Sequence, residues 1–212
     1  MMWGTGVWKD GNRGSLALRT SPLFQNQLSG PKLAVRDYWR LPESAPAVEW
    51  RSFVVQASPE AVRDALKASD RCYLTIINTP DEVVIAGEKS ACERVIAQLK
   101  CDAIMAPFDH VIHCPPMHSC YSDFVGIHTL PVHSVSDITF HTAADYGTVI
   151  PGRDTIARNI GSAVCATLDF PRLVNSVFNT GAQIFIEVGA GRTCTRWIDR
   201  ILAGKPHLAT SI

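Results

Sequence analysis

Tyr73-Leu74-Thr75-Ile76-Ile77-Asn78-Thr79-Pro80-Asp81, followed by Val83-Val84-Ile85-Ala86-Gly87, is the stretch that decides the fold. Two apolar runs rich in β-branched residues flank a turn of asparagine, proline and aspartate. This pattern predicts two strands joined by a short turn, at residues 73–77 and 83–86.

Helical patterns lie on both sides of this strand pair. Before it, residues 50–55 form a predicted strand, and Ser58-Pro59-Glu60 supplies an N-cap, a proline in the first turn and an acidic side chain near the positive end of the helix dipole. After it, residues 90–99 place their apolar side chains on one helical face, and residues 103–106 close the unit. The order βαββαβ over residues 49–108 predicts a ferredoxin-like subdomain.

Length and composition restrict the class of protein. The 212 residues are 46% hydrophobic and carry twenty basic and twenty acidic side chains. That length fits one large domain or a domain with an inserted subdomain, and the balanced charge indicates neither nucleic acid nor a membrane surface as a partner. The odd count of seven cysteines indicates thiols in a reducing compartment. No run is long enough to span a membrane and no signal peptide is recognisable, so we expect a soluble, cytoplasmic protein.

A histidine follows an apolar run in Val111-Ile112-His113-Cys114-Pro115-Pro116-Met117. The two prolines fix their own φ angles and donate no backbone hydrogen bond, so we expect them to end a strand and to hold the loop that carries His113. A histidine fixed at a strand end is well placed to act as a general base.

The second half of the chain has an α/β pattern. Residues 120–128, 153–166 and 171–180 are predicted helices, with extended stretches around Val132 and at 138–140. Residues 182–188 are nearly all apolar, which is typical of a buried parallel strand. Gly189-Ala190-Gly191 then leads into a helix that continues through Leu202. The region before residue 49 is interrupted by prolines, and a short helix is expected at 33–39.

Two of these motifs could also be interpreted as ligand-binding sites. Gly189-Ala190-Gly191 is compatible with a phosphate-binding turn or with the first motif of a methyltransferase, although a tight turn between strand and helix is favoured because only about twenty residues follow. The histidines and cysteines at positions 110–120 suggest zinc, but their spacing matches no standard ligand pair. We therefore expect no bound metal or cofactor.

Three stretches resemble the acyl-carrier-protein acyltransferases of fatty acid and polyketide synthases. Residues 77–87 are similar to the family's asparagine turn and Val-Ile-x-Gly segment. His113-Cys114-Pro115-Pro116-Met117 is similar to its His-Ser-Pro-x-Met, and residues 185–191 are similar to its Glu-Val-Gly-Pro-Gly. Within this family, the sequence most resembles the acyltransferase domains of polyunsaturated fatty acid synthases and heterocyst-glycolipid-type polyketide synthases. Residues 21–24, 28–31 and 194–198 carry this closer resemblance. The resemblance covers essentially the whole chain.

The resemblance implies a fold and a reaction. The fold is a large α/β-hydrolase-like subdomain, here residues 1–48 and 109–212, with a ferredoxin-like subdomain inserted at 49–108. The reaction moves a malonyl or other acyl group from CoA to the phosphopantetheine of an acyl carrier protein through a serine ester. His113 takes the place of the general base, and Asp169 falls where the family supplies a group that orients the histidine ring. Arg19 lies near the place of an arginine that binds the carboxylate of malonyl groups.

The sequence departs from this family at the nucleophile. It contains no Gly-x-Ser-x-Gly, and Met1–Trp8 resembles the helix that follows that elbow. We therefore expect the C-terminal portion of an acyltransferase, inactive alone, whose serine is supplied by another chain. The alternative is a non-catalytic remnant that docks to a carrier protein or to other synthase domains. The sequence does not identify the acyl group.

Overall fold

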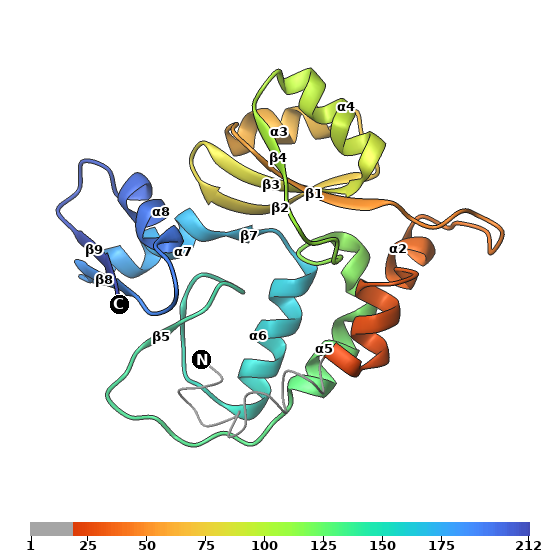
Figure 1. The fold of residues 1–212 in the computed structure, drawn as a ribbon. Coiled ribbons are helices and arrows are strands. Elements are labelled where there is room, and N and C mark those ends of the chain that lie inside the picture. The colour runs from red at the N-terminus through yellow and green to blue at the C-terminus, as the bar shows by residue number, and fades with distance from the viewer. Residues whose placement is uncertain (1–18) are drawn as a thin grey trace.

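The two runs around Asn78 form adjacent antiparallel strands in a five-stranded sheet. The computed structural model describes residues 19–212, and in it β2 (Cys72–Thr79) pairs with β3 (Glu82–Glu88). β1 (Trp50–Val55) pairs antiparallel with β3 on one side and with β4 (Ala103–Met105) on the other. The strands lie in the order β4-β1-β3-β2, and β7 (Leu168–Asp169) is added in parallel beside β2 (Figure 1).

Two helices cover one face of this sheet. α3 (Pro59–Leu66) begins as expected, because Ser58 Oγ accepts a hydrogen bond from the backbone N–H of Ala61 at 3.2 Å. α4 (Lys89–Leu99) ends at Lys100, which adopts a left-handed φ of 52°. Figure 1 shows both helices on the same side of β1–β4. Their apolar faces and the strands enclose a core that includes Val55, Val62, Ile85 and Val95.

The opposite face of the sheet packs against a layer built from segments on both sides of the βαββαβ segment in the sequence. Its helices are α2 (Leu33–Tyr38), α5 (Tyr121–His128), α6 (Arg153–Cys165), a π-helical segment (Leu23–Leu28) and a 3₁₀-helix (Pro115–Cys120). The fully buried Trp50 ring stacks on Trp39 and on Tyr73, with ring centroids 6.1 and 6.0 Å away. Trp39 Nε1 also donates a hydrogen bond to Tyr73 Oη at 2.7 Å. Residues before and after the βαββαβ segment therefore share one core.

The C-terminal elements form a third small core. α7 (Phe170–Asn179) and α8 (Thr193–Ile201) pack on one face of β8 (Ile184–Glu187) and β9 (Leu208–Ser211), which are parallel neighbours. Val174, Ile198 and Leu202 are buried there. β5 (Phe140–His141) and β6 (Thr148–Val149) form a separate antiparallel pair.

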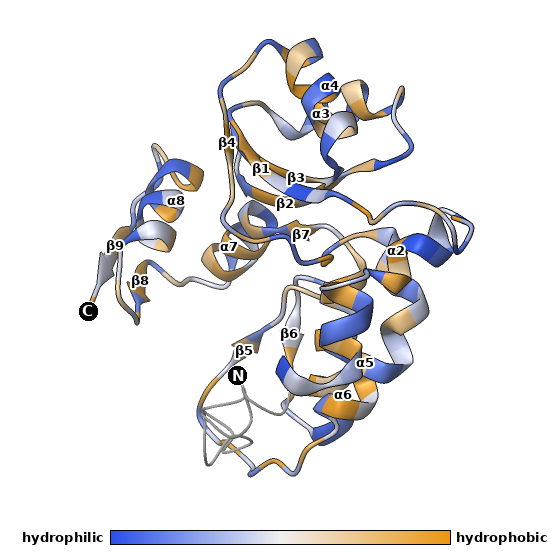
Figure 2. Cartoon of the chain, turned by 45° about the vertical axis from the view of Figure 1, so that its right-hand side comes forward, coloured by the Kyte–Doolittle hydropathy of each residue, from blue (hydrophilic) through white to orange (hydrophobic). Residues whose placement is uncertain are grey.

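Two expectations about extended segments are wrong. The apolar run at 182–188 forms a parallel strand, but Ile184 and Ile186 remain 65% and 55% exposed. Only the face toward α7 and α8 is covered within the described chain, and Figure 2 shows hydrophobic residues along β8 at the periphery of the molecule. The stretch around Val132 forms no strand, since no neighbouring segment of the described chain pairs with it.

Glu82 joins the sheet to the C-terminal helices. Its Oε1 accepts hydrogen bonds from Trp197 Nε1 and Asn78 Nδ2, both at 3.0 Å, and its Oε2 accepts one from Gln56 Nε2 at 3.0 Å. Arg200 lies 3.6 Å from the same carboxylate, whose side chain is 15% exposed. The hydrogen bonds from several donors compensate for the burial of this carboxylate. Removing the carboxylate leaves those donors without an acceptor.

No helix in the described range 19–212 has the length and apolar character needed to cross a lipid bilayer.

Replacing Glu82 with alanine should lower the free energy of unfolding by about 2–4 kcal/mol, because Trp197 Nε1 and Asn78 Nδ2 lose their acceptor. Chemical denaturation followed by tryptophan fluorescence measures this loss. Glu60→Gln is the matched control, because the ion pair of Glu60 with Arg63 is long, at 3.6 Å, and exposed. This variant should cost less than about 1 kcal/mol. Equal losses for the two variants would contradict the role assigned to Glu82.

Candidate functional site

His113 is held by its backbone between two distant segments. Its N–H donates to the carbonyl of Val164 at 2.7 Å, and the N–H of buried Val111 donates to the carbonyl of Leu28 at 3.1 Å. His113 itself adopts a left-handed φ of 56°, a conformation that few non-glycine residues adopt. The backbone around the histidine is therefore fixed by tertiary contacts.

The segment before the prolines is not a strand, which corrects the expectation from the sequence. Its backbone hydrogen bonds go to Leu28 and Val164 instead of to a neighbouring strand. Pro115 and Pro116 begin the 3₁₀-helix Pro115–Cys120, where their missing N–H groups leave no gap in a hydrogen-bond ladder. The prolines thus follow the histidine as the start of a short helix.

The ring of His113 is oriented by a backbone carbonyl. Its Nδ1 lies 2.5 Å from the carbonyl oxygen of Ala163, near the end of α6. A carbonyl oxygen only accepts hydrogen bonds, so this contact places the proton on Nδ1 and leaves the lone pair on Nε2. Burial lowers the pKa of His113 below its ordinary value, opposed by the bond to Ala163. The ring is therefore neutral near pH 7, as a general base must be.

Asp169 lies beside this site but caps a helix. Its carboxylate accepts a hydrogen bond from the backbone N–H of Arg172 at 2.9 Å, which closes the first turn of α7. No hydrogen bond between Asp169 and His113 is present among the described residues. The role of Asp169 in orienting the ring stays a prediction, and Ala163 is the group that contacts the ring.

Arg19 is the first residue that the structure describes, and it is exposed. Its predicted contact with a carboxylate is not tested by the described residues, and Met1–Trp8 lies outside the described range. Cys114, which stands where the resembled family has serine, is fully buried, and burial raises the pKa of its thiol. That environment is typical of an unreactive cysteine.

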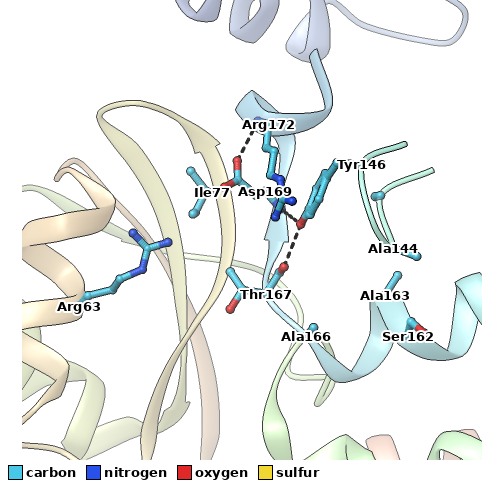
Figure 3. Close-up of a pocket in the computed structure, with 11 residues that line it drawn as sticks. Arg63, Ile77, Ala144, Tyr146, Ser162, Ala163, Ala166, Thr167, Asp169 and Arg172 are labelled. Atoms are coloured by element: carbon cyan, nitrogen blue, oxygen red, sulfur yellow. Dashed lines mark hydrogen bonds between the residues drawn. The ribbon is translucent and has the colours of Figure 1, made fainter. Parts of the chain in front are cut away.

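A cavity of about 380 Å³ lies next to Ala163 (Figure 3). Residues from α3, β2, the turn before β6, the end of α6 and the β7–α7 junction line it, among them Arg63, Tyr146, Ala163, Asp169 and Arg172. Tyr146 Oη donates to the carbonyl of Thr167 at 3.2 Å and accepts from the N–H of Asp169 at 2.9 Å. The tyrosine thus fixes the wall of the cavity.

Sequence reasoning missed Ala163, Tyr146 and Arg172. A backbone acceptor such as the Ala163 carbonyl has no side-chain signature, so no residue pattern indicates it. Tyr146 and Arg172 come together only through the tertiary fold, and neither stands in a motif that the sequence alone would single out.

The glycine turn after β8 serves the helix that follows. Gly189 and Gly191 have φ angles of 152° and 143°, which favour glycine. Glu187 Oε2 accepts hydrogen bonds from the backbone N–H and the hydroxyl of Thr195, both at 2.8 Å. The carboxylate therefore occupies the N-terminal turn of α8, where an anionic ligand would have to bind. This arrangement favours the tight turn over a nucleotide site.

The histidines and cysteines at 110–120 do not converge. Among residues 19–212, no three side chains of metal-binding type form a group that fits a metal ion. His118 is exposed and its Nε2 lies 3.3 Å from the carbonyl of Cys165, while Cys120 is buried. All seven cysteines are free.

The comparisons with known proteins point to one fold. No protein-family profile matches the chain. A subunit of the polyunsaturated fatty acid synthase of a Thraustochytrium species is 27% identical over 196 residues, which cover 85% of this chain and 10% of that protein. The chain therefore spans about a tenth of the length of this curated relative.

Solved structures agree with that match. An acyl carrier protein S-malonyltransferase from Vibrio cholerae superposes with a TM-score of 0.67 at 20% identity, over 80% of this chain and 57% of its own. A malonyl-transacylase solved in complex with the acyl carrier protein of a type II polyketide synthase gives a TM-score of 0.66 at 19% identity, over 85% and 57%. The chain has the mixed α/β fold of malonyl-CoA:acyl-carrier-protein transacylases and polyketide synthase acyltransferase domains over the part that superposes.

NMR titration should show His113 with its proton on Nδ1 and with a pKa below the ordinary value of about 6.5. Burial disfavours the charged ring, so protonation is delayed to lower pH and the folded state loses stability as the pH falls below that ordinary value. Comparison with the spectrum of His113→Gln assigns the signal. A midpoint at or above 6.5, or a proton on Nε2, would contradict this geometry.

Proposed function

We propose that this chain supplies the histidine of an acyltransferase site in a fatty acid or polyketide synthase. The observation that carries the proposal is the His113 ring, kept neutral by burial and oriented by Ala163 so that Nε2 is free to accept a proton. The similarity to transacylase structures supports the reaction class. In this interpretation the βαββαβ segment is the ferredoxin-like subdomain, and residues 1–48 and 109–212 belong to the α/β-hydrolase-like subdomain.

The nucleophile in this mechanism is a serine outside these 212 residues, because the sequence has no Gly-x-Ser-x-Gly. His113 Nε2 takes the proton of the serine hydroxyl while the oxygen attacks the carbonyl of an acyl-CoA thioester. The C–S bond breaks, and the CoA sulfur leaves with the proton from the histidine. The thiol of phosphopantetheine on a carrier protein then attacks the serine ester with the same histidine as base, which regenerates the serine.

The partners follow from this chemistry. One solved neighbour is itself bound to an acyl carrier protein, and we propose a carrier protein as the acceptor for this chain, with other synthase domains as neighbours. No bound cofactor is required, since CoA and phosphopantetheine enter as substrates. We also propose that Arg19 contacts the carboxylate of a malonyl group. We propose that Asp169 gives additional support to the His113 ring.

Transfer should appear when the chain is combined with a segment that carries the serine elbow. We would co-express the chain with such a serine-bearing segment, taken from the Thraustochytrium synthase. Mass spectrometry would then follow malonyl transfer from CoA to a carrier protein. His113→Gln should reduce the rate by about 10²–10⁴-fold. His118→Gln is the matched control and should change the rate little, because His118 is exposed on the adjacent 3₁₀-helix. Equal effects of the two variants would rule out His113 as the base.

A docking module is the second candidate function. The observation in its favour is the exposed apolar face of β8 and the residue after it: Ile184, Ile186 and Val188 are 65%, 55% and 80% exposed. Contiguous apolar surface of this kind indicates contact with other polypeptide. The same co-expression distinguishes the two functions, because a stable complex without transfer supports docking and not catalysis.

A further inference from the structure

The cavity beside Ala163 carries two guanidinium groups from different parts of the fold. Arg63 reaches it from α3 of the βαββαβ unit, and Arg172 reaches it from the first turn of α7 (Figure 3). Asp169 is the acidic residue in its lining, and that carboxylate already accepts the N–H of Arg172. The lining is therefore net positive in a chain whose overall formal charge is zero.

Arg172 is positioned without being neutralised by a salt bridge. Its Cζ lies 4.4 Å from the centroid of the Tyr146 ring, and Tyr146 is itself fixed by the bonds to Thr167 and Asp169. Stacking on an aromatic face leaves the edge of the guanidinium free to donate hydrogen bonds. No carboxylate lies within 4.0 Å of this guanidinium in the part of the chain that the structure describes. A pre-positioned, unpaired guanidinium is suited to an oxyanion.

The guanidinium of Arg63 is held only weakly by its ion pair with Glu60. Its ion pair with Glu60 is 3.6 Å long, and the two side chains are 53% and 77% exposed. Exposed pairs of this kind contribute little, so a ligand in the cavity competes easily for the arginine.

The cavity also adjoins the proposed base. Ala163 lines it, and the carbonyl of the same residue contacts the His113 ring. A group bound in the cavity therefore lies against the residue whose carbonyl orients the His113 ring.

We propose that this cavity binds an oxyanion, a carboxylate or a phosphate, of the acyl thioester ligand, with Arg172 as the main contact and Arg63 as the second. This assignment rests on the proposed function, since it takes its ligand to be a thioester of that reaction. A phosphate in this cavity leaves Arg19 as the proposed carboxylate contact, whereas a carboxylate in the cavity would replace Arg19 in that role. The carboxylate would come from the acyl group, and the phosphate from the phosphopantetheine arm.

Calorimetric titration of the 212-residue chain tests the assignment with four ligands: malonyl-CoA, acetyl-CoA, 4′-phosphopantetheine and pantetheine. Arg172→Gln should weaken binding about tenfold, and Arg63→Gln by a smaller factor. A loss for malonyl-CoA with unchanged acetyl-CoA identifies a carboxylate. A loss for both CoA esters and for phosphopantetheine, with unchanged pantetheine, identifies a phosphate.

Arg94→Gln on α4 is the matched control, because it removes one exposed positive charge that does not line the cavity. Unchanged affinities in both cavity variants, the same loss in Arg94→Gln, or no binding of any ligand by the unaltered chain would overturn the proposal. Should Arg172→Gln fail to fold, Arg63→Gln decides alone. Transfer with unchanged affinities would refute the cavity assignment only, and altered affinities without transfer would refute the proposed function only.

Discussion

The pairing of β7 with β2 is the constraint on which the site depends. Leu168 and Asp169 lie in parallel register with Ile76 and Ile77, and Thr167 Oγ1 donates to the carbonyl of Leu74 at 2.7 Å. α6 ends immediately before this strand and α7 begins immediately after it. The short strand therefore fixes both the carbonyl that contacts His113 and the arginine that enters the cavity. β7 is thus the segment that connects both α6 and α7 to β2.

In the C-terminal unit, one face of the β8–β9 sheet is buried and the other face is exposed. α7 and α8 bury one face of β8 and β9, whereas the other face exposes isoleucines that burial would stabilise. Parallel strands are almost always covered on both faces, because their crossover connections place other elements there. Within the described residues, no element covers the face of β8 that exposes Ile184 and Ile186.

The elements of the βαββαβ segment were predictable because their signals are local. Ser58 and Pro59 predict the start of α3, and the β-branched runs around Asn78 predict β2 and β3. Long helices such as α6 were also found near their observed bounds. β7 was not predictable, since a two-residue strand has no period and its partner is distant in sequence. Within the site, the sequence indicated His113, but the group that orients it is a backbone carbonyl, and the cavity arginines meet only through the tertiary fold.

The most direct test of the central claim is to find which polypeptide carries the acyl group. The chain and a serine-bearing segment would be incubated together with malonyl-CoA in the absence of carrier protein, and the intact mass of each polypeptide would be measured. We expect the malonyl adduct on the serine-bearing segment, formed rapidly with the unaltered chain and slowly with His113→Gln. An adduct on the 212-residue chain that a carrier protein removes would contradict the account, because it would place the nucleophile and not only the base within these residues.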